Sequence, residues 1–145
     1  MKEPVVTVIV ASYNHAPYIE QCILSVLQQT YPHIELLVVD DGSTDDSVQR
    51  IERLQEQYGF DFRTQKNKGL TCTLNETIAR AKGSLIAPFG SDDIMCPERI
   101  AKQVAYMQDK PEVGICAGNI ELIDSGGELF PEARQRRDTP FRRLD

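Results

Sequence analysis

The sequence predicts an α/β domain built on an open, mainly parallel β-sheet with helices on both faces. Apolar runs of strand length alternate along the chain with segments whose apolar residues recur every three or four positions. That alternation is typical of consecutive βα units. A length of 145 residues with 41% hydrophobic content suits a single domain. We expect residues 1–131 to form it and residues 132–145 to be a basic tail, extended or mobile.

The first βα unit begins at residues 5–11, which read VVTVIVA. This β-branched run has no polar alternation, which is typical of a strand buried on both faces. A helix is predicted from Pro17, because the apolar residues between 19 and 27 share one helical face. It should end before Pro32, since the residue before a proline disfavours helical geometry.

The same alternation continues along the chain. Further buried strands are predicted at 34–39, 60–64, 84–89 and 113–118. A second helix is predicted at about 48–58, closed by Gly59. A third is predicted at about 71–82, with Leu74, Ile78 and Ala81 inward and Gly83 beyond its end. A fourth begins at Pro97, with Ile100, Val104 and Met107 inward. Ser125-Gly126-Gly127, between two apolar stretches, indicates a C-terminal hairpin.

Charge and cysteine content exclude several classes of protein. Residues 1–131 carry 11 basic and 19 acidic side chains, whereas residues 132–145 carry five arginines and three acids. An acidic body argues against a nucleic-acid partner, because phosphate-backbone binding needs clusters of lysine and arginine. The four cysteines lack C-x-x-C spacing, so we expect them to be reduced and buried, without zinc. With no long apolar run and no apolar leader, we expect a soluble, cytoplasmic chain.

Polar residues gather in four loops that directly follow predicted strands. These loops are SYNH at 12–15, DDGSTDD at 40–46, QKNKG at 65–69 and GSDD at 90–93. Ligands of open α/β sheets bind at the carboxyl ends of the strands. We therefore expect the four loops to meet on one rim and to carry the chemistry of the protein.

Part of this polarity has a purely structural explanation. Ser43 or Thr44 can cap the second helix, and the acids at 45–46 suit the positive end of its dipole. Asn14 and Asn67 can be either turn residues or ligands, since asparagine tolerates left-handed geometry.

The acid pairs at 40–41 and 92–93 have no such explanation. Adjacent carboxylates at a strand end repel one another, and the helices that follow already have their own start signals. Magnesium and manganese are typically held by one or two carboxylates together with substrate phosphates. The second pair therefore indicates a site for Mg²⁺ or Mn²⁺ and for a phosphate-bearing ligand.

Three other phosphate chemistries are excluded by their missing residues. In phosphatases of the haloacid dehalogenase type a nucleophilic aspartate stands two positions before the second acid, where this chain has Val39. No G-x-G-x-x-G follows the first strand, and no P-loop occurs.

Two longer stretches resemble a known family. VTVIVASYNHAPYIEQCILSVLQQTYPHIELLVVDDGSTDDS, followed by NKGLTCTLNETIARAKGSLIAPFGSDD, is similar to the nucleotide-sugar-binding half of family 2 glycosyltransferases. The resemblance covers about residues 4–118 in unbroken order. It implies a GT-A fold, which is Rossmann-like, and a nucleoside diphosphate sugar as donor, most often a uridine one.

The resemblance also implies roles for single residues. Tyr13 and Ala11 would line the base pocket, Asp41 would accept a hydrogen bond from the base imide, and Asp40 would hold the loop or assist. Asp92 would bind the ribose, and Asp93 would coordinate the metal. The implied nucleotide-sugar-binding set is Ala11, Tyr13, Asn14, Asp40, Asp41, Lys66, Asn67, Gly69, Ser91 and Asp92, and the implied metal ligands are Asp93 and Asp92.

The family reaction implied is inverting transfer of the sugar to a hydroxyl of a saccharide or lipid-linked acceptor, with metal help and a general-base aspartate. Gly90 stands where the family often has the first acid of D-x-D-D, and the general base is expected beyond Asp145. The chain would then be the donor half of a longer transferase.

The alternatives are a nucleotide-sugar-binding or interaction domain without transfer activity. The arginines of 132–145 could face anionic lipid at the inner side of the membrane, or could be a solvated tail.

Overall fold

The computed structural model describes residues 3–130. Strands and helices alternate in it as β1 (Val6–Ser12), α1 (Ile19–Leu27), β2 (Ile34–Asp40), α2 (Ser47–Tyr58), β3 (Asp61–Thr64), α3 (Leu70–Ile78), β4 (Leu85–Gly90) and α4 (Arg99–Gln108). The four strands form one parallel sheet in the order β3-β2-β1-β4. The predicted α/β class with a parallel sheet is therefore confirmed. Within this part of the chain no helix is long and apolar enough to cross a membrane.

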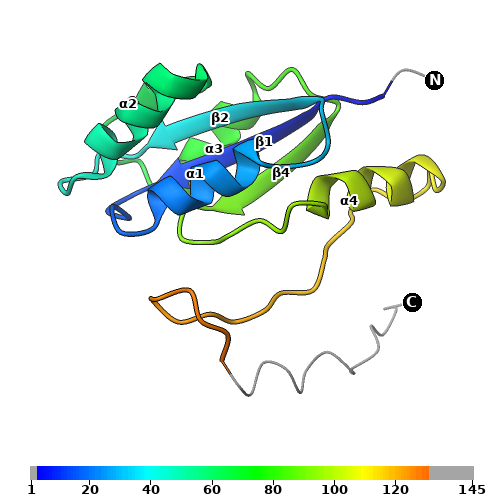
Figure 1. Cartoon of the computed structure of the whole chain (residues 1–145). Helices are drawn as coiled ribbons and strands as arrows, with labels where there is room; N and C mark the ends of the chain where they lie inside the picture. The colour runs from blue at the N-terminus through cyan, green and yellow to red at the C-terminus, as the bar shows by residue number, and fades with distance from the viewer. Residues whose placement is uncertain (1–2, 131–145) are drawn as a thin grey trace.

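The main core lies on the face of the sheet that α1, α2 and α4 cover. Figure 1 shows α1 in front of the sheet, α2 at its upper left, α4 at its lower right and α3 behind it. Val8 and Val10 of β1 are fully buried there with Ile23 of α1, Ile51 of α2 and, nearly buried, Ile100 of α4. The continuous apolar runs of β1 and β2 follow from this arrangement, because a central strand buries both of its faces.

The opposite face is covered differently from what the sequence predicts. α3 buries Thr73 and Thr77, which are 0% and 2% exposed, and leaves Ile78 41% exposed. Ile78 as an inward residue is therefore a wrong prediction. Threonine can take this place because its hydroxyl is satisfied locally, as where Thr77 Oγ1 donates to Thr73 O at 2.7 Å.

α3 also ends earlier than predicted, at Ile78 rather than near residue 82. Gly83 is the reason. A Cβ atom on Gly83 would lie 2.6 Å from Thr7 N and 2.7 Å from Val5 O, and Gly83 N donates to Thr7 Oγ1 at 2.9 Å. The backbone must leave the helix to reach β1 this closely, so the glycine serves a close approach instead of a helix end.

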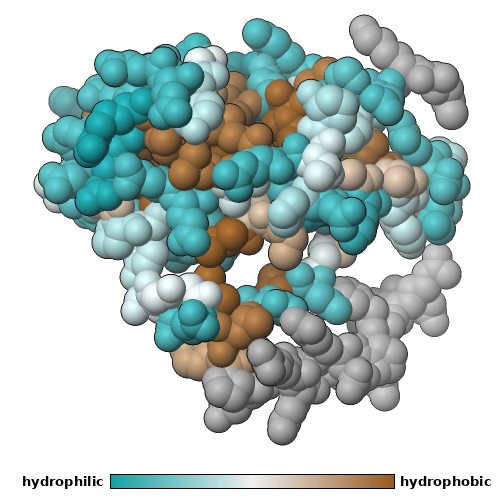
Figure 2. Space-filling model, in the orientation of Figure 1, coloured by the Kyte–Doolittle hydropathy of each residue, from teal (hydrophilic) through white to brown (hydrophobic). Residues whose placement is uncertain are grey.

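The predicted fifth strand at 113–118 is absent. Ile115 is 88% exposed, and a cavity of about 480 Å³ lies between Gly114–Cys116, β4 and α4. Apolar composition alone cannot make a strand when no neighbouring backbone pairs with it. At the predicted hairpin the structure has one antiparallel bridge, between Ile123 and Leu129, and no more extensive strand pairing within residues 3–130. Figure 2 shows brown, hydrophobic residues on this segment, which lies below α4.

β4 leaves its outer edge unpaired in the described sheet. Leu85 N donates across to Val5 O, so strand alternation turns the amide positions of Ile86 and Pro88 to the open side. Proline has no N–H to donate, and it is tolerated in strands at such edges.

The four cysteines are unpaired, as expected, but the prediction that all are buried is wrong. Cys22 is buried, whereas Cys72 and Cys96 are exposed. Cys72 lies on α3 outside the face that buries Thr73 and Thr77.

Candidate functional site

The carboxyl ends of the strands lie level with one another, as the sequence predicts for four loops on one rim. The register pairs Ser12 with Asp40, Ala11 with Gly90, and Asp40 with Thr64. Asp41 N donates to Ser12 O at 2.8 Å, which extends the β1–β2 ladder past the strand end. The loops after all four strands consequently start from one edge.

The loop after β1 is fastened to the loop after β2 by Asn14. This residue has a positive φ of 53°. Its backbone N–H donates to Ser43 Oγ at 2.8 Å, and its side-chain Oδ1 accepts from Thr44 N at 2.8 Å. Asn14 is thus a turn residue whose side chain holds the neighbouring loop. Tyr13 beside it is 48% exposed, so its ring is available to a ligand.

Asp40 is completely buried, and its carboxylate serves its own loop. Oδ1 accepts from Gly42 N at 3.1 Å and Ser43 N at 2.8 Å, and Oδ2 accepts from Ser43 Oγ at 2.6 Å. Of the two roles that the family resemblance implies for Asp40, this geometry favours holding the loop.

The predicted cap of α2 is wrong. The helix begins at Ser47, after an N-cap at Asp46 that makes no side-chain capping bond. Asp45 accepts instead from Ala16 N at 3.0 Å and from Ser47 N at 2.9 Å. Burial by itself would raise the pKa of Asp45, but hydrogen bonds from Ser47 and Ala16 lower it below its ordinary value. Its carboxylate therefore joins two loops in addition to lying near a helix start.

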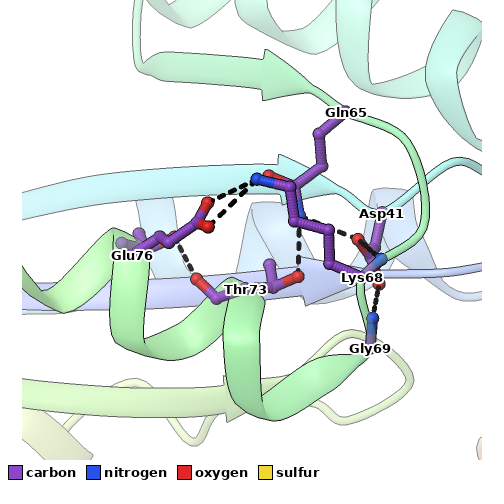
Figure 3. A network of polar contacts seen from close by, with 7 residues as sticks. Asp41, Gln65, Lys68, Gly69, Thr73 and Glu76 are labelled. Atoms are coloured by element: carbon purple, nitrogen blue, oxygen red, sulfur yellow. Dashed lines mark hydrogen bonds and ion pairs between the residues drawn. The ribbon is translucent and has the colours of Figure 1, made fainter.

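Asp41 is the anchor of the loop between β3 and α3. It is 4% exposed, its Oδ1 accepts from Gln65 Nε2 at 2.8 Å and Lys68 N at 2.9 Å, and its Oδ2 accepts from Gly69 N at 2.9 Å. Figure 3 shows the carboxylate directed at this loop, with Thr73 on the other side of the Gln65 amide. Burial alone would raise the pKa of Asp41, but these hydrogen bonds outweigh it and lower the pKa.

Beyond Gln65, the β3–α3 loop presents its polar side chains outward. Lys66 and Asn67 are exposed, and Gly69 has a φ of 82° at the start of α3. A Cβ atom on Gly42 would lie 2.9 Å from Asn67 N, so this loop and the loop after β2 are in close contact. Sequence reasoning did not assign Gln65, although this residue lies in the loop it selected.

Asp92 and Asp93 converge above Gly90. Both are exposed, and a Cβ atom on Gly90 would lie 2.5 Å from Asp93 Oδ2 and 3.2 Å from Asp92 Oδ1. An aspartate at position 90 could not coexist with this arrangement. The glycine thus leaves room for the two carboxylates that follow it.

This pair fits a hard divalent cation. Within residues 3–130 no three carboxylate, imidazole or thiol groups are close enough to hold a metal ion by themselves. Two exposed carboxylates that approach one point suit Mg²⁺ or Mn²⁺, which usually complete their coordination with water and ligand phosphates. Burial, with a contribution from the charges of Asp93 and Asp92, raises the pKa of the Cys22 thiol to about 12, so this neighbour stays neutral.

His15 joins the loop after β1 to the loop that carries this pair. Its Nδ1 lies 2.6 Å from Ser91 Oγ, and Ser91 is 3% exposed. Sequence reasoning missed His15, because the contact spans 76 positions and no local pattern marks it. Ser91 was predicted to bind ligand, whereas its hydroxyl is buried against the imidazole.

A larger cavity, of about 660 Å³, lies away from this rim. Its lining includes Ile34 and Asp61, the first residues of β2 and β3, so it opens at the amino ends of the strands. Ligands of open parallel sheets bind at the opposite, carboxyl ends. The convergent acids and loops also lie there, and we assign the site to them.

Comparison with known proteins agrees with this assignment. The family model described as "Glycosyl transferase family 2" matches residues 7–144. The putative teichuronic acid biosynthesis glycosyltransferase TuaG of Bacillus subtilis is 36% identical over 111 residues, which are 74% of this chain and 44% of TuaG. The matches to eight curated relatives, TuaG among them, cover between 23% and 54% of the relatives' own length.

Solved structures of glycosyltransferases share the fold. The mannosyltransferase PcManGT of Pyrobaculum calidifontis, in complex with GDP-Man and Mn²⁺, superposes with a TM-score of 0.69 and 28% identity over 76% of this chain and 34% of its own. S. aureus TarS 1–349 in complex with UDP gives a TM-score of 0.66 and 28% identity over 72% of this chain and 32% of its own. These neighbours have the GT-A fold. The chain belongs to glycosyl transferase family 2.

Proposed function

We propose that this chain is the donor-binding part of an inverting, metal-dependent glycosyltransferase that uses a UDP-linked sugar. The observation that carries the proposal is the convergence of Asp92 and Asp93 above Gly90, on the rim to which the strand ends and their loops lead. A chain with a net charge of −6 would repel a diphosphate unless a cation stood between them.

The base would lie on the side of the rim formed by the first three loops. The half-exposed ring of Tyr13 offers a stacking surface, and Ala11 lies two residues before it at the end of β1. Asp41 Oδ2 accepts a hydrogen bond from Gly69 N, and a carboxylate oxygen has a second lone pair for the imide N–H of uracil. Lys66 and Asn67 are exposed on the adjoining wall.

The diphosphate would lie toward Asp92 and Asp93. Asp92 would bind the ribose and Asp93 would hold Mn²⁺ or Mg²⁺, with Asp92 as a second ligand. When bound, the cation would neutralise the charge that builds on the departing diphosphate, which needs no proton transfer. The residues of this chain would supply binding, orientation and a fixed metal position.

Acceptor binding and the general base belong, in this proposal, to the part of the longer relatives that this chain does not span. The relative TuaG is named for teichuronic acid biosynthesis, and TarS was solved with UDP, which supports a saccharide of the cell envelope as acceptor and uridine as the base. A lipid-linked acceptor would fit a cytoplasmic location at the inner face of the membrane. The arginines proposed to face that membrane lie outside the described residues.

Thermal unfolding with UDP tests the proposal, with and without MnCl₂. We expect UDP to raise the melting temperature more with Mn²⁺ than with EDTA, because ligand binding to the folded state stabilises it by mass action. Asp93→Asn should remove the Mn²⁺-dependent part. Asp109→Asn, which removes the same charge at the far end of α4, is the matched control and should behave like the wild type. GDP in place of UDP tests the choice of base.

Activity on the donor separates an enzyme from a binding module. Hydrolysis of UDP-linked sugar by this chain, lost in Asp93→Asn, would support transfer chemistry. Metal-dependent binding without turnover would support the nucleotide-sugar-binding alternative. If UDP causes no shift under either condition, the proposal of a UDP-linked donor fails. If GDP also causes none, the result supports the interaction-domain alternative.

A further inference from the structure

His15 is a side chain of the rim that nothing in the proposed function uses. It follows Tyr13 by two positions, and its imidazole Nδ1 lies 2.6 Å from the hydroxyl of Ser91. A hydroxyl both donates and accepts, so either tautomer of the imidazole keeps this hydrogen bond. The contact links the base side of the rim to the segment that carries Asp92 and Asp93.

The backbone of His15 is held from three directions. Its amide donates to Ser47 Oγ at 3.0 Å, and its carbonyl accepts from Tyr18 N and Ile19 N, both at 2.9 Å. The amide of Ala16 donates to Asp45 Oδ2 at 3.0 Å. The imidazole therefore extends from a fixed point toward Ser91.

Ser91, the partner of the His15 imidazole, lies directly before the acid pair. Ser91 is 3% exposed and lies between Gly90 and Asp92. Asp93 N donates to Gly90 O at 3.2 Å, so the turn that carries the two carboxylates starts at the strand end and passes through Ser91. A shift of Ser91 would move Asp92 and Asp93 with it.

We propose that His15 is a positioning residue that couples metal binding to nucleotide binding through its hydrogen bond to Ser91. The inference rests on the proposed function, since it concerns how Asp92 and Asp93 meet the diphosphate. The bond between His15 and Ser91 fixes the separation between the loop after β1, where the base would bind, and the carboxylates of Asp92 and Asp93. By linkage, each ligand then raises the affinity for the other.

The test measures UDP binding by isothermal titration calorimetry, once in MnCl₂ and once in EDTA. The ratio of the Kd in EDTA to the Kd in MnCl₂ reports the coupling, and it needs no acceptor or turnover. We expect His15→Ala to lower this ratio by about two- to tenfold, the range expected when one hydrogen bond is lost, while the Kd in EDTA stays unchanged. Ser91→Ala should lower the ratio equally, and the double variant no further, because both changes remove one interaction.

Two further variants separate positioning from stability. His15→Asn keeps a polar atom near the place of Nδ1 and should restore the ratio, whereas a merely structural effect would lower thermal stability without that rescue. His33→Ala removes the chain's other histidine, which pairs with Glu3 at 2.9 Å and contacts Tyr31, and should keep the wild-type ratio.

The possible failures can be told apart. A wild-type ratio of one overturns the proposed metal dependence and this inference with it. A wild-type ratio above one that persists in His15→Ala overturns this inference alone. If His15→Ala does not fold, Ser91→Ala probes the same bond from its other end, and an unchanged ratio there also overturns the inference.

Discussion

Replacing Asp41 with asparagine should destabilise the fold, although the two side chains have the same shape. The carboxylate accepts three hydrogen bonds, two at Oδ1 from Gln65 and Lys68 and one at Oδ2 from Gly69. An asparagine must turn its NH₂ group toward one of these sets of donors. At least one bond is lost, and a nearly buried N–H is left facing another donor.

The magnitude follows from the kind of bond lost. A hydrogen bond to a charged group contributes ~1.5–3 kcal/mol, and an unsatisfied buried donor costs ~1–3 kcal/mol more. Together these terms predict that Asp41→Asn lowers the free energy of unfolding by about 2.5–6 kcal/mol at pH 7. Urea denaturation followed by circular dichroism measures it, with Asp109→Asn, an exposed aspartate, as the control.

The pH dependence gives a second measure of the same carboxylate. The pKa of Asp41 is lower in the folded protein than its ordinary value, so the unfolded chain binds the proton first as pH falls. The stabilisation is present above about pH 4, the ordinary aspartate range, and is lost as pH falls through the lower, folded pKa. The difference between wild type and Asp41→Asn should therefore be constant near neutral pH and shrink below about pH 4. Equal stability of Asp41→Asn and Asp109→Asn at pH 7 would refute Asp41 as the anchor of this loop.

Three further predictions concern glycine and cysteine positions. Gly90→Ala should keep the fold but weaken Mn²⁺-dependent UDP binding in calorimetry, because its methyl group would displace a carboxylate whose oxygen lies 2.5 Å from the Cβ position. Unchanged binding would mean that this arrangement is not needed for the metal. Gly83→Ala should cost about 2 kcal/mol or more in urea denaturation, since backbone atoms stand 2.6 Å from its Cβ position, whereas Gly114→Ala, with nothing within 4 Å, should cost little. In thiol labelling at pH 8 the exposed Cys72 should react at once, while Cys22, whose pKa is raised to about 12, should react only on unfolding; early labelling of Cys22 would contradict its burial.

Local pattern predicts the elements of this fold well where an element packs against the sheet in the usual way. The runs at β1 and β2 are continuous because both faces are buried, and this can be recognised in the sequence alone. The pattern fails where a partner is required. VGICAG has strand composition, but no described strand pairs with it. α3 also inverts the usual rule, because threonines with locally bonded hydroxyls occupy its inner face.

Sequence reasoning predicts where the site lies better than what each side chain does there. Strand order and register bring the selected loops to one edge, which follows from the parallel topology. The division of work between Asp40 and Asp41 depends on which backbone amides reach each carboxylate. Asp40 binds amides only two and three positions away, whereas the bonds of Asp41 form only when loops 24 or more positions apart meet. The contact of His15 with Ser91 likewise depends on distant loops. The ligand roles of these residues stay predictions until binding is measured.

Pro88 has a consequence for how this protein behaves at high concentration. A strand from another molecule that added itself beside β4 would find no N–H at position 88 and would lose one bond of the ladder it tried to build. The missing donor makes this margin of the sheet a poor template for accidental sheet extension. Replacing Pro88 with a residue that has an N–H would restore the donor and with it the tendency to self-associate.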